Sequence, residues 1–94
     1  MADNFELVKN EEKQQYEILV DGEVAGFSVY EDGGNIRTLP HTVVDNKFRG
    51  QGLSKPLIQF ALDDVRSDGL KVNPLCPAVS GFIKKNPEYQ DLVA

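Results

Sequence analysis

One glycine-rich hexapeptide, Arg49-Gly50-Gln51-Gly52-Leu53-Ser54, separates an apolar, strand-like run from an amphipathic segment with helical spacing. The run before it reads His41-Thr42-Val43-Val44. The first N–H groups of a helix have no internal acceptor and carry the positive end of the helix dipole. A glycine-rich turn that joins a strand to a helix therefore predicts a binding site for a phosphorylated ligand.

Downstream of the hexapeptide, apolar residues recur at near-helical spacing, at Leu53, Leu57, Phe60, Ala61 and Val65. This spacing predicts a core-packed helix of about four turns. Pro56 leaves the start of the helix open, because a start at Gln51 would cost a hydrogen bond and a start nearer Ser54 would cost less.

Upstream of the hexapeptide, apolar and polar residues alternate in short runs that predict strands over 4–8, 14–20, 23–31 and 35–44. Asp21-Gly22 supplies the pair of residues that a tight hairpin turn prefers, because both central positions need positive φ. Pro40 interrupts the fourth run, since proline cannot donate a hydrogen bond to a neighbouring strand. We therefore expect that strand to be kinked, or to leave its neighbour, at Pro40.

The predicted elements continue with a fifth strand over 70–76 and a short helix over 78–85, which Asn86-Pro87 stops. The helix between the fourth and fifth strands makes a parallel crossover the simplest connection. The order β-β-β-β-α-β-α predicts an α+β fold with a mixed, mostly antiparallel sheet, in one domain over residues 1–94.

The chain has 15 acidic and 10 basic residues and a net charge of −5, which argues against a general attraction to nucleic acid or to an anionic membrane. Lys47, Arg49 and Lys55 nevertheless surround the glycine-rich turn and favour a local anion site. A single cysteine, Cys76, excludes an internal disulfide, and one cysteine with one histidine cannot form the usual zinc site. With no long apolar run and no signal-like start, we expect a cytoplasmic protein.

The hexapeptide and its surroundings resemble the pyrophosphate-binding segment of the GNAT acetyltransferase superfamily. That segment reads Gln or Arg, two residues, Gly, one residue, then Gly or Ala. Arg49, Gly52 and Ser54 occupy these positions, and Ser54 is a departure from the usual small apolar residue. From about residue 14 to about residue 92, order, spacing and length resemble the minimal GNAT-like group of acetyltransferase domains.

The resemblance implies acetyl-coenzyme A as the cosubstrate and an unidentified amine as the acceptor. It also implies that the fourth and fifth strands splay apart and hold the pantetheine arm in the gap. On this sequence Val43 and Val44 would offer backbone groups to pantetheine, and all six residues of the hexapeptide would cradle the pyrophosphate. Residues 84–86 either reach the adenosine phosphate or face solvent.

Two residues are candidates for the chemistry at the implied thioester. His41 is either the base that deprotonates the amine, whose free pKa is near ~10.4, or a structural residue of the sheet. Cys76 is either a reacting thiol, which accepts the acetyl group or protonates the departing thiolate, or a small buried apolar residue. Tyr89 is a weaker candidate proton donor, because it follows the predicted helix stop.

Three functions remain open at this point. The leading one is acetyl transfer from acetyl-coenzyme A to an amine. The second is a non-catalytic module that binds coenzyme A or acyl-coenzyme A, or a subunit of a complex, because the segment 10–13 leaves only a turn where larger relatives insert acceptor-binding helices. The third is a small interaction domain that uses the edge of the 35–44 strand.

Overall fold

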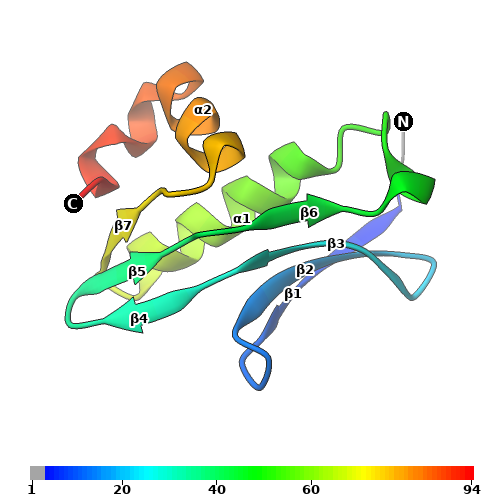
Figure 1. The fold of residues 1–94 in the computed structure, drawn as a ribbon, viewed down its shortest axis with the longest axis horizontal. Coiled ribbons are helices and arrows are strands. Elements are labelled where there is room, and N and C mark those ends of the chain that lie inside the picture. The colour runs from blue at the N-terminus through cyan, green and yellow to red at the C-terminus, as the bar shows by residue number, and fades with distance from the viewer. Residues whose placement is uncertain (1–3) are drawn as a thin grey trace.

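Seven strands form the framework of the computed structural model, which describes residues 4–94 (Figure 1). They are β1 (Phe5–Asn10), β2 (Gln15–Val20), β3 (Glu23–Val29), β4 (Glu31–Gly33), β5 (Ile36–Thr38), β6 (Thr42–Val44) and β7 (Lys71–Asn73). One sheet has the order β1-β2-β3-β6 and the other the order β4-β5-β7. All neighbours are antiparallel except β5 and β7, so the predicted α+β fold with a mixed, mostly antiparallel sheet is confirmed.

The turn between β2 and β3 has the conformation that its sequence predicts. Asp21 and Gly22 both have positive φ, 52° and 79°. Two successive positive φ values are those of a two-residue turn whose twist matches the flanking strands. The register from Gln15 to Val29 also contains one irregularity, between Ile18 and Leu19.

A bulge bends the long hairpin that β3–β4 forms with β5–β6. Ser28 pairs with Thr42, and Glu31 pairs with Thr38. Between these two pairs the first strand advances by three residues and the second by four, which leaves one extra residue around Pro40. The predicted interruption at Pro40 is confirmed, and it divides the expected fourth strand into β5 and β6.

The parallel partner of β5 separates from β6 just after this bulge. The Leu39 N–H donates to the Asn73 carbonyl at 3.0 Å, and the Cys76 N–H donates to the Leu39 carbonyl at 3.0 Å. Beyond that point β6 continues while the other segment turns into a helix (Figure 1). The splay between the expected fourth and fifth strands is thus present, although β7 ends at Asn73 rather than at Cys76.

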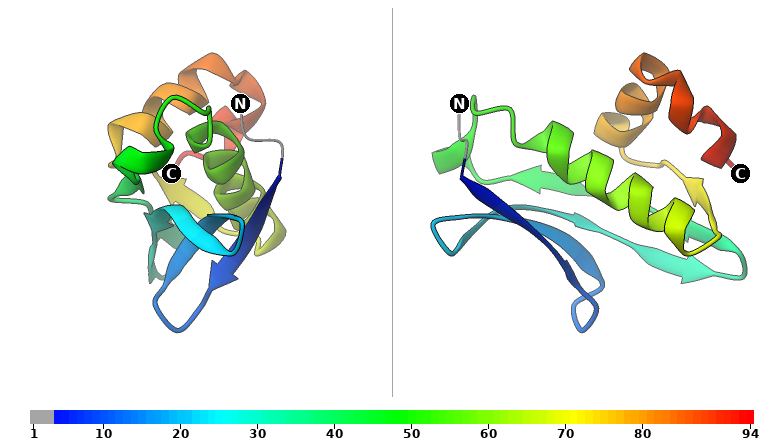
Figure 2. Two further views of the ribbon diagram at one scale, coloured as in Figure 1. Left: turned by 90° about the vertical axis from the view of Figure 1, so that its right-hand side faces the viewer. Right: turned by 180° about the vertical axis from the view of Figure 1, so that it is seen from behind.

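The long helix lies across one face of the sheets, and the short helix that follows β6 lies at the end of that strand (Figure 2). The helices are η1 (Asn46–Phe48), α1 (Ser54–Ser67), α2 (Pro77–Lys85) and η2 (Pro87–Leu92). The apolar stripe of α1 is buried against the sheet, through Leu57, Ile58, Ala61, Leu62 and Val65. Among residues 4–94, no helix is long and apolar enough to cross a membrane.

The start of α1 resolves the question that Pro56 raises in the sequence. The helix begins at Ser54 with Leu53 as its N-cap, and the Leu57 N–H donates to the Leu53 carbonyl at 3.3 Å. Pro56 therefore lies in the first turn, where a missing N–H costs nothing because it would have no intrahelical acceptor.

Gly26 allows β6 to approach β3 closely, and we expect Gly26→Ala to lower the free energy of unfolding by about 1–3 kcal/mol. A methyl group there would come within 2.9 Å of the Val43 carbonyl oxygen, a backbone atom that cannot move without shifting β6. Gly33→Ala is the control, because its methyl group would meet no atom within 4 Å. Urea unfolding followed by circular dichroism measures both, and equal stability of the two variants would contradict the prediction.

Candidate functional site

The hexapeptide forms an open loop between η1 and α1. The buried side chains of Phe48 and Leu53 fix its two ends in the core. Gly50 and Gly52 both have positive φ, 84° and 70°, which a side chain with Cβ rarely adopts. A Cβ at either glycine would nevertheless meet no atom within 4 Å, so the loop is open to a ligand on that side.

The N-terminus of α1 adjoins this loop with its donors free. No side chain caps the helix. The N–H groups of Leu53, Ser54 and Lys55 have no intrahelical acceptor by helix geometry. Together with the amides of the loop they form a concentration of donors at the positive end of the helix dipole, which is an environment that suits a phosphate oxygen.

The free edge of β6 presents backbone groups of alternate residues. The His41 carbonyl accepts from Val29 and the Asp45 N–H donates to Ala25, so Val43 between them also directs its backbone groups at β3. Thr42 and Val44 direct theirs to the open edge. The expectation that Val43 offers backbone groups to a ligand is therefore not supported by this register, whereas that for Val44 is compatible with it.

Arg49 bridges the loop and the free edge of β6. Its Nε donates to the Val44 carbonyl at 3.2 Å. The side chain thus lies where β6 leads into the glycine-rich loop, at the end of the splay opposite Cys76. Its guanidinium adds positive charge beside the open amides of the loop.

Cys76 lies at the closed end of the splay and is the N-cap of α2. It is only 5% exposed. Burial by itself would raise the pKa of the thiol, but the nearby Val79 N–H, Thr42 hydroxyl and Ala78 N–H outweigh it and hold the pKa below its usual value. These donors stabilise the thiolate, the reactive form of cysteine.

Thr42 connects Cys76 to the sheet. Its hydroxyl shares a hydrogen bond of 3.0 Å with the Ser28 hydroxyl, and its backbone N–H also contacts the thiol. The sequence identifies Cys76 but not Thr42, because the direction of the Thr42 side chain depends on the bulge and on the register of β6. A hydroxyl at alternate positions of paired strands is the only sequence signal for it.

His41 lies on the other side of the splay from Cys76. Alternation along β6 places its side chain with Val43, on the face away from α1, and the ring is exposed. The backbone carbonyl of His41 bonds to Val29. The two candidate reacting residues therefore flank the same gap from opposite faces of the sheet.

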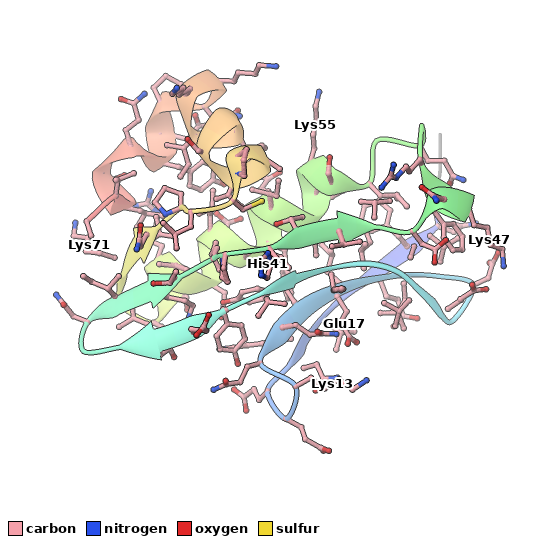
Figure 3. All side chains as sticks on the ribbon, viewed as in Figure 1. Lys13, Glu17, His41, Lys47, Lys55 and Lys71 are labelled. Carbon is pink, nitrogen blue, oxygen red and sulfur yellow. The ribbon has the colours of Figure 1, made fainter. Side chains whose placement is uncertain are left out.

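A cleft of about 620 Å³ separates the first half of α1 from α2. It is lined by Ser54, Lys55, Ile58, Gln59, Pro77, Ala78, Gly81, Phe82, Lys85 and Asn86. Lys55 extends outward from the first turn of α1 (Figure 3). The cleft thus extends from the start of α1, next to the glycine-rich loop, to the start of α2, next to Cys76. Lys55 and Lys85 line its walls.

The Tyr89 hydroxyl is hydrogen-bonded to a carboxylate of α1. It donates to Asp63 at 2.8 Å, and burial together with this carboxylate raises its pKa to about 12. The ring packs against Phe82, one of the cleft residues. The contact with Asp63 ties the hydroxyl to the outer surface of α1 rather than to the thiol of Cys76.

Comparison with solved structures identifies the fold. A candidate GCN5-like N-acetyltransferase from Staphylococcus aureus has a TM-score of 0.74 and 22% identity, with coverage of 98% of this chain and 90% of that one. A candidate streptothricin acetyltransferase from Bacillus anthracis, solved in complex with acetyl-coenzyme A, has a TM-score of 0.59 and 26% identity over 85% of this chain and 53% of that one.

Sequence comparison gives the family. Protein NATD1 of Bos taurus is 38% identical over 60 residues, which make up 64% of this chain and 53% of that protein. The chain spans about half the length of the curated relatives it matches. The model of the GCN5-related N-acetyl-transferase family matches residues 15–92. With the splayed strands and the fold described above, this match shows that the chain belongs to the GCN5-related N-acetyltransferase family.

Proposed function

We propose that this protein binds acetyl-coenzyme A and transfers the acetyl group to an amine. The observation that carries the proposal is one continuous path, from the free amides of the glycine-rich loop, along the open edge of β6, to Cys76. A pyrophosphate, a pantetheine arm and a thioester follow one another in the same order in the cosubstrate. The presence of acetyl-coenzyme A in the Bacillus anthracis relative supports the assignment.

The residues divide along this path by the chemistry that they offer. The amides of residues 50–54 and the guanidinium of Arg49 suit the pyrophosphate. The Thr42 carbonyl and the Val44 N–H, which are the outward backbone groups not engaged by Cys76 or Arg49, offer partners to the amides of a pantetheine arm. Lys55 and Lys85, on the walls of the cleft, suit a further phosphate on the adenosine.

Acetyl transfer needs a neutral amine, an electrophilic carbonyl and a proton for the departing thiolate. The amine nitrogen attacks the carbonyl carbon, the carbon–sulfur bond breaks, and coenzyme A leaves as a thiolate. His41 takes a proton from the attacking amine on the open side of the sheet. On the opposite side, Cys76 has one of two roles. As a thiol it gives a proton to the leaving sulfur of coenzyme A. As a thiolate it attacks the carbonyl carbon first, coenzyme A leaves as a thiolate, and the amine then attacks the Cys76 thioester and releases the Cys76 thiolate.

Titration with acetyl-coenzyme A tests the binding step, and Gly52→Asp is the informative variant. A carboxylate beside the pyrophosphate costs about 2–3 kcal/mol, which lowers affinity by roughly 30- to 150-fold. Gly52→Asn is the matched control, because asparagine has the same size and the same positive-φ requirement without the charge.

Isothermal titration calorimetry measures the three affinities. We expect Gly52→Asn to bind much more tightly than Gly52→Asp, and both to unfold at similar denaturant concentrations. Equal affinity in the two variants would remove the pyrophosphate from this loop. No binding of acetyl-coenzyme A by the unmodified protein at millimolar concentration would end the proposal.

A coenzyme-A-binding module without transferase activity is the second candidate. The observation that favours it is the turn between β1 and β2, which leaves no helical insertion to enclose an acceptor. A thiol-release assay with mixed amines distinguishes the two functions. Binding without release above hydrolysis favours the module, and amine-dependent release favours the transferase.

The third candidate function is an interaction domain that uses the edge of the 35–44 strand. The structure leaves only the second part of this strand with a free edge. β5 pairs with β4 on one side and with β7 on the other, so residues 36–38 have no free edge. Only β6 keeps one. That edge borders the splay and belongs to the path proposed for the cosubstrate.

A further inference from the structure

The sheet face opposite α1 carries a buried carboxylate that the proposed mechanism does not use. Tyr16 contacts Phe60 and Asp64 of α1, so its neighbours Gln15 and Glu17 point away from that helix. Glu17 is only 7% exposed although it lies on this uncovered side. Figure 3 shows Glu17 on β2 and His41 beside β6, at two places along the same sheet.

The strand register defines the surface around Glu17. One row across the strands contains Val8, Glu17, Phe27 and Val43, and the next row contains Asn10, Gln15, Val29 and His41. We call these two rows the open sheet face. They contain no lysine and no arginine, and Phe27 and Val29 form an apolar floor between the carboxylate of Glu17 and the ring of His41.

The hydrogen bonds of Glu17 leave one carboxylate oxygen available. Asn10 Nδ2 and Gln15 Nε2 both donate to Oε2, at 3.2 Å and 2.6 Å. Within residues 4–94, no hydrogen bond to Glu17 Oε1 is found. Every fully buried side-chain oxygen in these residues has a hydrogen-bond partner, so Oε1 is not fully buried and is accessible from the surface. No lysine or arginine of the described chain forms an ion pair with Glu17, which is unusual for a buried carboxylate.

A second acidic group borders the same surface. A hollow of about 190 Å³ is lined by Val24, Ala25, Gly26, Phe27, Val43 and Asp45. Asp45 uses one oxygen to accept from the Lys47 N–H at 2.9 Å. Negative charge and apolar side chains thus surround the open sheet face, which complements a flexible cation with an apolar middle.

We infer that the open sheet face binds the acceptor, that Glu17 pairs with a protonated amine of that acceptor, and that the preferred acceptors are therefore alkyl diamines. This inference rests on the proposed function. β2 and β6 are two strand spacings apart, about 10 Å. An acceptor held at Glu17 by one ammonium group can cross the apolar floor and present its other, neutral amine at the splay beside His41.

Acetyl transfer to a seven-carbon α,ω-diamine and to the matching monoamine tests the inference. We expect a KM about tenfold lower for the diamine, because only it forms the ion pair with Glu17. Glu17→Gln should raise the diamine KM to that of the monoamine and leave kcat unchanged, since glutamine still accepts from Asn10 and Gln15. Glu6→Gln, which removes a charge from β1 one row further away, should keep the preference.

Two results would overturn the inference: equal KM values for the two amines in the unmodified protein, or a diamine preference that persists in Glu17→Gln. An NMR titration with the diamine gives a readout that does not depend on turnover. Shifts at the amides of Gln15, Glu17 and Val29 that vanish in Glu17→Gln support the site even if no amine is acetylated, in which case only the transferase function fails. The absence of such shifts rejects the site.

Discussion

Replacing Arg37 by alanine is expected to lower the free energy of unfolding by about 3 kcal/mol, the largest effect on stability that we predict for a single side chain. For a chain of this length the whole free energy of unfolding is about 5–14 kcal/mol. Arg37→Ala should therefore remove a substantial part of it.

The reason is the position of Arg37 among carboxylates. Arg37 belongs to β5. Its side chain is 5% exposed and lies between Asp32 of β4 and Asp64 of α1. Nε and Nη2 donate to the two oxygens of Asp32 at 2.6 Å and 3.0 Å, and Nη1 donates to Asp64 and Asp68 at 3.0 Å and 2.9 Å. Removal of the guanidinium leaves Asp32, Asp64 and Asp68 without their shared partner. Within residues 4–94, only Asp64 and Asp68 of these three remain paired, both with Lys9.

Arg66→Ala is the matched control. Arg66 also binds one aspartate through two nitrogens, at 2.9 Å and 3.0 Å to Asp91, but both side chains are about half exposed. Exposed ion pairs contribute about 0–1 kcal/mol. Urea unfolding of the two variants should therefore differ by about 2 kcal/mol or more, and an equal loss would show that burial of Arg37 contributes little.

Acid unfolding provides a second readout of the same network. Hydrogen bonds from Arg37 lower the pKa of Asp32 and of Asp68, and Lys9 contributes to the lowering at Asp68. A carboxyl whose folded-state pKa is lowered stabilises the fold above its unfolded pKa, near ~3.9, and loses this contribution as pH falls through the lower, folded value. Between pH of about 5 and 2, the stability of the unmodified protein should therefore fall more steeply than that of Arg37→Ala.

The sequence predicts those features that depend on neighbours along the chain. The Asp21-Gly22 turn, the interruption at Pro40 and the glycine-rich loop each follow from the conformational limits of one or two residues. The end of the fifth strand is less accessible to such reasoning. Pro74 follows Asn73 directly and cannot donate to a sheet, and Cys76 caps a helix instead of ending a strand.

Contacts between distant segments explain what the sequence does not reveal. The pairing of Arg37 with Asp64 and Asp68 joins β5 to α1 across 27 and 31 positions. Likewise, which of Thr42, Val43 and Val44 faces the splay depends on the bulge, because a shift of one residue reverses every side chain and backbone group. The composition and spacing of the sequence determine neither the ion pairs of Arg37 nor the orientation of residues 42–44.

Replacing Cys76 by alanine is expected to lower the rate of acetyl transfer by about 10²- to 10⁴-fold, if the transferase function holds, with little change in the affinity for acetyl-coenzyme A. The thiol is held where β6 and α2 diverge, and its donors favour the thiolate. Alanine removes the reacting sulfur but keeps the small volume of the site. Steady-state kinetics and calorimetry on the same variant separate rate from binding.

Two further variants distinguish a reacting thiol from a structural one. Thr42→Val keeps the shape of the side chain but removes the hydroxyl that helps to lower the pKa of Cys76, so this pKa should rise. The rate depends on the thiolate if Cys76 is the nucleophile, so it should then increase with pH over a higher range in Thr42→Val than in the unmodified protein. Thr42→Ser keeps a hydroxyl at this position and should not shift this range.

Mass spectrometry after mixing with acetyl-coenzyme A, without an amine, decides between the two roles left to Cys76. An added acetyl group on the peptide that contains Cys76 identifies it as the nucleophile. A normal rate in Cys76→Ala would instead assign the thiol to the packing of the splay. If the rate of Cys76→Ala falls but no acetylated cysteine forms in the unmodified protein, Cys76 is assigned the other role. In that role its thiol protonates the coenzyme A thiolate that departs after the amine attacks.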